Sequence, residues 1–145
     1  MGQRTYPFDI QTLLKDAGAI TADAAAQVGG VNQILDLGIA RIDAIAVIDV
    51  TALDISSADE NYRLVLQGSN SPTFASGIQN LAIMELGATA ARPGGAADSL
   101  VGRYELMFTN EQADVTYRYV RAYTDVTGTT PSINYTAFVT ELPTP

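Results

Sequence analysis

The sequence predicts an all-β fold, an antiparallel β-sandwich in jelly-roll-like order with an extended N-terminal arm. From Ile34 onward, apolar residues recur with a period of two, which is the pattern of half-buried strands. Turn residues separate these apolar runs at short and fairly regular intervals. The chain has 145 residues, 47% of them hydrophobic, which is enough for one continuous core. We therefore expect an arm at 1–33 and one sandwich domain at 34–145.

The predicted arm joins a short amphipathic piece to a tract of small residues. Alanine favours a helix at 17–26, but Gly18 and Thr21 interrupt the tract and little in it is large enough to bury. A loosely attached extended segment is therefore expected, ended by Gly29-Gly30. Large apolar residues near its start must pack on the parent sandwich or on a neighbouring subunit. These candidate docking residues are Tyr6, Phe8, Leu13 and Leu14.

Seven segments of the sandwich domain have the alternation and the bounding turns of strands. They are 33–38, 44–53, 61–68, 80–86, 102–110, 115–125 and 133–142. Turn residues at 68–72 and 127–131, and a longer loop at 88–99, separate several of them. Seven short antiparallel strands are typical of a sandwich.

The segment 116–123 carries a dense set of tyrosine and arginine residues. Alternation places Tyr117, Tyr119 and Tyr123 on one face with Arg121, and either face of this strand could point inward. Tyrosine and arginine are enriched in protein–protein interfaces, although cross-strand packing within a sandwich uses the same residues. We select Tyr117, Tyr119 and Arg121 as candidate subunit-contact residues, and a sugar-binding platform would use the same aromatic side chains.

The composition excludes several classes of function. The chain has no histidine and no cysteine, which removes catalytic triads, Cys-His pairs, the common zinc ligands and disulfides. Its formal net charge is −8 and its pI is about 4.2, which argues against direct binding to nucleic acid. No signal peptide or membrane-spanning stretch is evident, so we expect synthesis in the cytoplasm and no membrane partner.

Carboxylates are the remaining candidates for chemistry. The densest acidic cluster, Asp49, Asp54, Asp59 and Glu60, offers oxygen ligands for calcium. However, counted from Asp54 the EF-hand positions for glycine and glutamate are not matched, and a solvated loop explains the cluster. Asp49 and Glu85 would be the pair for glycoside hydrolysis, yet nothing in the sequence fixes their separation. We therefore expect no enzymatic activity, no metal and no cofactor.

Several short motifs resemble the capsid cement (decoration) proteins of tailed bacteriophages. In those proteins an Asp-Leu-Gly follows a small-residue tract, as at 36–38 here. A Gln-Gly-Ser strand comes next, as at 67–69, and a Tyr-Arg-Tyr strand runs into an Asp-Val-Thr-Gly turn, as at 117–119 and 125–128. Arg121 lies between these last two motifs. The resemblance extends over nearly the whole chain.

The resemblance implies a structural virion protein without catalysis. Such a protein would bind the outer surface of a phage head at junctions between major capsid protein subunits, as a trimer or alternatively as a dimer, and would stabilise the head. Other functions stay open from the residues alone. They are a carbohydrate-binding sandwich on a head or tail, a carboxylate hydrolase, and a tail-tube or head-completion protein.

Overall fold

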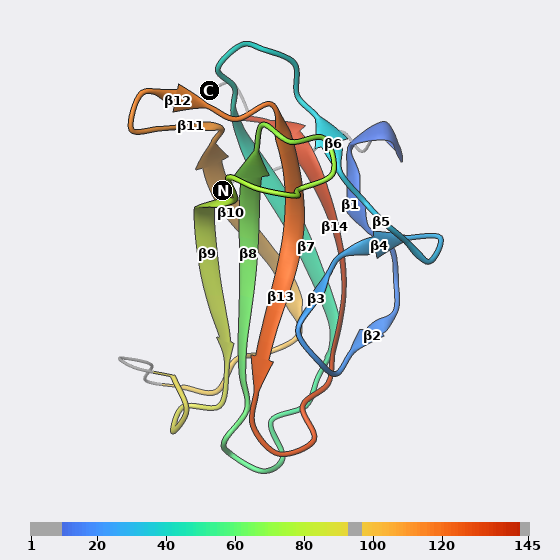
Figure 1. The fold of residues 1–145 in the computed structure, drawn as a ribbon. Helices are drawn as coiled ribbons and strands as arrows, with labels where there is room; N and C mark the ends of the chain where they lie inside the picture. The colour runs from blue at the N-terminus through green and yellow to red at the C-terminus, as the bar shows by residue number, and fades with distance from the viewer. Residues whose placement is uncertain (1–9, 93–96, 143–145) are drawn as a thin grey trace, which may run out of the picture.

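The chain folds into two antiparallel sheets that pack face to face, as seen in a computed structural model that describes residues 10–92 and 97–142 (Figure 1). The first sheet has the strand order β1-β14-β7-β10, with β2 also paired to β14. Its strands are β1 (Leu13–Lys15), β2 (Ala19–Ile20), β7 (Asp43–Leu53), β10 (Gly102–Thr109) and β14 (Ile133–Glu141). The predicted all-β antiparallel sandwich is confirmed at this level.

The second sheet has the order β3-β13-β8-β9, and β6 also pairs with β13. Its strands are β3 (Ala24–Ala25), β6 (Leu35–Asp36), β8 (Asn61–Ser69), β9 (Gln79–Gly87) and β13 (Tyr119–Thr127). Two small hairpins and a 3₁₀ turn complete the described chain. They are β4 (Gln27–Val28) with β5 (Val31–Asn32), β11 (Glu111–Gln112) with β12 (Val115–Thr116), and η1 (Ile10–Thr12).

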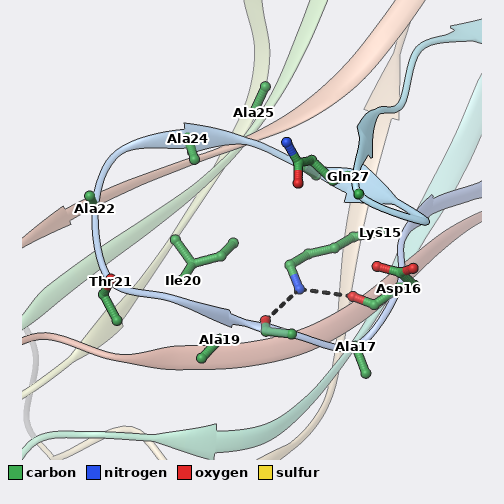
Figure 2. A pocket seen from close by; sticks show the side chains of 13 residues that line it. Lys15, Asp16, Ala17, Ala19, Ile20, Thr21, Ala22, Ala24, Ala25 and Gln27 are labelled. Carbon is green, nitrogen blue, oxygen red and sulfur yellow. Dashed lines mark hydrogen bonds between the residues drawn. The ribbon is translucent and has the colours of Figure 1, made fainter.

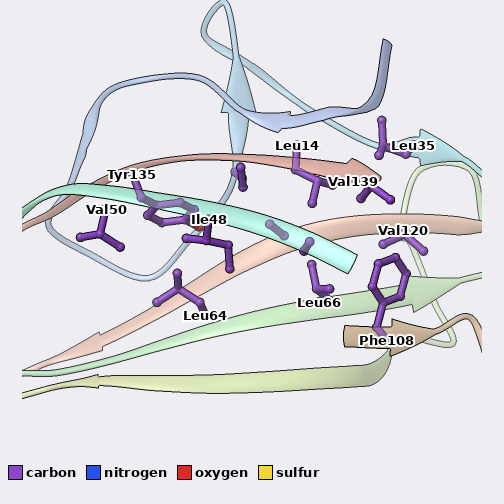
Figure 3. Close-up of a cluster of buried hydrophobic side chains, with 14 of the residues drawn as sticks. Leu14, Leu35, Ile48, Val50, Leu64, Leu66, Phe108, Val120, Tyr135 and Val139 are labelled. Atoms are coloured by element: carbon purple, nitrogen blue, oxygen red, sulfur yellow. The ribbon is translucent and has the colours of Figure 1, made fainter. Parts of the chain in front are cut away.

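The core lies between the two sheets, where inward-facing side chains of both layers meet (Figure 3). Alternation produces this layer: Ile48 and Val50 of β7 point inward, as do Leu64 and Leu66 of β8. Val120 of β13 is also fully enclosed. The period-two pattern of the sequence is therefore the pattern of this interior, and residues between these positions face outward.

The predicted strand at 115–125 is divided in the structure. Residues 115–116 belong to the β11–β12 hairpin, and β13 begins only at Tyr119. The side chain of Asn70 accounts for the break, because its amide donates to the Thr116 carbonyl (3.1 Å) and its oxygen accepts from the Arg118 N–H (2.9 Å). These bonds satisfy backbone groups that a continuous strand would have used for its ladder.

Part of the predicted arm at 1–33 is paired with the sandwich, while its strands β4 and β5 pair with each other. β1 and β2 pair with β14, while β3 pairs with β13, so this segment passes from an edge of one sheet to an edge of the other. Leu14 is 0% exposed and belongs to the core. Short extended pieces can attach in this way because edge strands offer unpaired backbone N–H and C=O groups.

Candidate binding surfaces

One candidate surface is the outer face of the second sheet. Tyr119, Arg121 and Tyr123 alternate along β13 with buried Val120 and Ala122, so the three side chains point away from the core. Cross-strand neighbours on this face come from β8, since Arg121 lies opposite Gln67 and Tyr123 opposite Val65. We call this surface, formed by Tyr119, Arg121, Tyr123, Val65 and Gln67, the Tyr/Arg face. It brings together two of the predicted contact residues, Tyr119 and Arg121.

The guanidinium of Arg121 is held in position by three side chains. Its central carbon lies 4.5 Å from the centre of the Phe74 ring and 5.6 Å from that of Tyr123. Its Nε donates to Oε1 of Gln67 at 2.9 Å. Burial lowers the pKa of Arg121, which Tyr123 partly opposes, but an arginine remains cationic at neutral pH. Such cation–π contacts and the amide bond fix the direction in which the guanidinium points.

Phe74 reaches Arg121 because a loop holds its backbone in an unusual conformation. Its φ is 56°, in the left-handed region that a bulky residue rarely adopts. The hydroxyl of Ser71 accepts from the Ala75 N–H, and the Ser71 carbonyl accepts from the Phe74 N–H. The hydroxyl of Ser69 donates to the Ser76 carbonyl at 2.8 Å. Together these bonds hold the strained turn that places the Phe74 ring against the arginine.

Tyr117 lies elsewhere, although the sequence places it with Tyr119. It precedes β13, and a Cβ added to Gly68 would lie 2.8 Å from the Tyr117 Cβ. Gly68 pairs with core residue Val120, so Tyr117 covers the inner side of β8. The bend between β12 and β13 is the reason, because it interrupts the alternation that links positions 117 and 119.

Arg118, next to the bend, forms a paired ion bridge on the surface. Its Nε and Nη2 donate to the two carboxylate oxygens of Asp36 at 2.8 and 2.9 Å. These hydrogen bonds, with one from the Gly38 N–H, lower the pKa of Asp36 to about 2. Arg63 is likewise paired with Glu85.

The outer face of the first sheet is different in character. Val47 is 0% exposed and Ile45 is also buried, although both point away from the main core. Phe138 and Leu13 cover them, and Met107, opposite Ile45 on the edge strand β10, is 64% exposed. We call these five residues the apolar face.

A hollow of about 400 Å³ adjoins the apolar face. Leu13 and Phe138 line its apolar side, while Asp49 and Arg103 line a charged side and form an ion pair of 2.7 Å. Of the predicted docking residues, Leu13 is therefore at a surface hollow and Leu14 is in the core. Tyr6 and Phe8 lie outside the described residues.

Sequence reasoning missed the role of Lys15, the single lysine of the chain. Its buried ammonium donates to the carbonyls of Asp16, Gly18 and Tyr135 at 2.8 to 2.9 Å, and it lies 4.7 Å from the centre of the Tyr135 ring. Figure 2 shows it under the loop of residues 16–27, which surrounds a hollow of about 460 Å³. Burial lowers the pKa of Lys15, although Asp16 opposes the effect. The sequence feature that could have indicated this role is the position of the lysine, directly after two leucines and before a tract of small residues.

The carboxylates considered as catalytic or metal-binding groups either lie far from each other or accept hydrogen bonds from nearby residues. Asp49 points outward from β7 and Glu85 outward from β9, on opposite sides of the sandwich, so the two cannot flank one glycosidic bond. The pKa of Asp54 is lowered by hydrogen bonds from Ser56, and that of Asp59 by hydrogen bonds from Thr129. Within 10–92 and 97–142, acidic side chains form no group of three or more placed to bind a metal ion.

Comparisons with known proteins add no relative: no model of a protein family matches the chain, and no curated protein matches it. In the part of the chain that the structure describes, no helix has the length and apolar character needed to cross a membrane.

Proposed function

We propose that this chain is a structural virion protein, without enzymatic activity, that binds the outer surface of a phage capsid at junctions between major capsid protein subunits. In this role it stabilises the head as a cement protein. The motifs that resemble phage decoration proteins support the proposal. The chain would be made in the host cytoplasm and would need no cofactor, membrane or nucleic acid.

The observation that carries the proposal is the presence of two candidate contact surfaces on opposite sides of one core. The apolar face lies outside the first sheet, and the Tyr/Arg face lies outside the second. A body with two such surfaces can contact two neighbours at once, and linked weak contacts add through multivalency. We assign shell docking to the apolar face, where exposed Met107 and the hollow beside Leu13 offer apolar area.

We also propose that the sandwich is a jelly roll, and its strand order supports this. Counting β1, β3 with β6, β7, β8, β9, β10, β13 and β14 as strands one to eight, the first sheet runs 1-8-3-6 and the second 2-7-4-5. Two interleaved Greek keys produce this order, and capsid and lectin domains share the architecture.

A carbohydrate-binding module on a head or tail is the second candidate. A hollow of about 380 Å³ beside Tyr117 supports it, since an aromatic ring and several polar groups meet there. Tyr117, Asn70, Ser71, Ser76 and Gly77 line it. Aromatic faces with nearby hydroxyl and amide groups are the chemistry that holds a sugar ring.

Co-sedimentation tests the proposal directly. The purified chain is mixed with expanded heads of the phage that carries it, prepared without the protein. We expect saturable binding and a higher disruption temperature of the heads. Absence of binding by a chain shown to be folded by circular dichroism would contradict the cement function. Retention on a polysaccharide column in that case would favour the carbohydrate-binding candidate.

A further inference from the structure

Arg121 differs from the other arginines that stand on the sheet faces. Arg63 and Arg103 each pair with a carboxylate, and Arg118 at the start of β13 does so as well. Among the described residues, no carboxylate lies within ion-pair distance of Arg121, whose Nε is taken up by Gln67. Its terminal nitrogens therefore remain available, in a fixed direction, on a chain with a net charge of −8.

A fixed guanidinium with free terminal N–H groups is matched by a carboxylate, which can accept two parallel hydrogen bonds. The hollows described above are lined by other residues, and Arg121 stands on an open sheet face. Small ligands bind mainly in concave sites, whereas open faces with arginine and tyrosine are typical of protein interfaces. The expected occupant is therefore an acidic side chain of a protein.

The β11–β12 hairpin presents such a side chain. Its two central residues, Ala113 and Asp114, have φ values of 52° and 63°, as in a type I′ turn. Glycine, asparagine and aspartate are favoured at such positions, so Asp114 suits the turn and Ala113 carries its conformational cost. Figure 1 shows the hairpin projecting at the upper left of the sandwich. Asp114 is exposed and has no bonding partner among the described residues, and adjacent Val115 is 42% exposed.

We propose that the Asp114 carboxylate of one copy binds the terminal nitrogens of Arg121 in a second copy. Exposed Val115 would then pack against the tyrosine rings of the Tyr/Arg face. The contact between the two copies would therefore combine an ion pair with an apolar contact. The Arg121 site is complete only when the second copy supplies the carboxylate. This inference rests on the proposed cement function, for which the resemblance implies a homo-oligomer. A repeated contact of this kind gives a dimer or a ring where the rotation between copies closes.

Charge reversal tests the contact by sedimentation velocity over a range of protein concentrations. We expect the unaltered chain to associate, and Arg121→Glu and Asp114→Arg each to weaken association at least about tenfold. The double variant, Arg121→Glu with Asp114→Arg, should recover most of the association because the pair is restored in reverse. Glu141→Arg is the matched control, since Glu141 is also exposed and without a bonding partner among the described residues. Its association should be unchanged.

Several outcomes would overturn the inference: a monomer at all concentrations, single variants that associate normally, or a double variant that stays as weak as the singles. Circular dichroism establishes that each variant is folded. Co-sedimentation with heads distinguishes the partner. If Arg121→Glu weakens head binding but leaves self-association intact, the carboxylate belongs to the shell protein and the inference about a second copy is wrong, while the cement proposal survives.

Discussion

The two outer faces of the sandwich differ in how completely their side chains are covered. On the apolar face, Val47 and Ile45 are buried by Phe138 and Leu13, so most of this surface contributes to folding. On the Tyr/Arg face, Val65 is buried, but the two tyrosines, Gln67 and Arg121 are only half-buried, and Arg121 retains unused donors. We infer that substitutions at the buried residues of the first face mainly affect folding, whereas substitutions at its exposed Met107 and on the second face mainly affect binding.

The largest expected contrast is between Phe138→Ala and Tyr123→Ala. Phe138→Ala should lower the free energy of unfolding by about 3–4 kcal/mol, because it removes a buried ring from the apolar cluster. Tyr123→Ala should cost about 1 kcal/mol, since its ring is half-exposed. Urea denaturation measures both values. Equal losses would show that the two faces do not differ in the way inferred here.

Replacement of Lys15 tests how much its buried ammonium stabilises the segment that passes from the first sheet to the second. In Lys15→Met, three carbonyl groups lose a charged donor, and we expect the free energy of unfolding to fall by about 2–3 kcal/mol. Arg41→Met, which removes an exposed cation, is the matched control and should change little. A Lys15→Met protein as stable as the unaltered chain would show that removing the buried charge offsets the lost hydrogen bonds.

Alkaline pH provides a third test, through the buried hydroxyl of Tyr135. Burial raises its pKa from 10 to about 12, although the hydrogen bond with Thr124 opposes the shift. The folded state therefore holds this proton more tightly than the unfolded state. The resulting stability is fully present below pH 10 and is lost as the pH rises through about 12. At about 1.4 kcal/mol per pKa unit, the loss is about 2–3 kcal/mol.

Tyr135→Phe should remove this contribution and flatten the fall in stability above pH 10. Lys15 lies against the Tyr135 ring, but it is present in both proteins, so its own titration largely cancels in the difference. The measurement is urea denaturation at intervals from pH 7 to 12. Parallel curves over the whole range would contradict the assignment to Tyr135.

Met107→Ser should have the smallest effect on folding and a selective effect on binding. Because Met107 is 64% exposed, the free energy of unfolding should stay within about 0.5 kcal/mol. Head binding should weaken several-fold if the apolar face docks on the shell. Unchanged binding would show that Met107 is not part of the docking surface.

The alternation of apolar and polar residues predicts much of the fold. Contacts between segments far apart in the sequence determine the rest. The period of two located the long strands and placed Tyr119 and Arg121 on one face, but it left open which face points inward; the burial of Val120 and Ala122 in the structure decides this. It could not place Tyr117, because the bend depends on Asn70, which lies far away in sequence. The attachment of residues 13–32 depends on free edges of other strands, and the position of Phe74 depends on a strained turn. Neither leaves a periodic signal.

The most direct test of the central claim compares the disruption temperature of expanded heads saturated with the unaltered chain, with Met107→Ser and with Arg121→Gln. The account predicts that the unaltered chain raises this temperature. Met107→Ser should reduce both binding and protection. Arg121→Gln should still bind but protect less, because neighbouring copies are no longer joined. Heads whose disruption temperature does not change when the folded, unaltered chain is added would contradict the account.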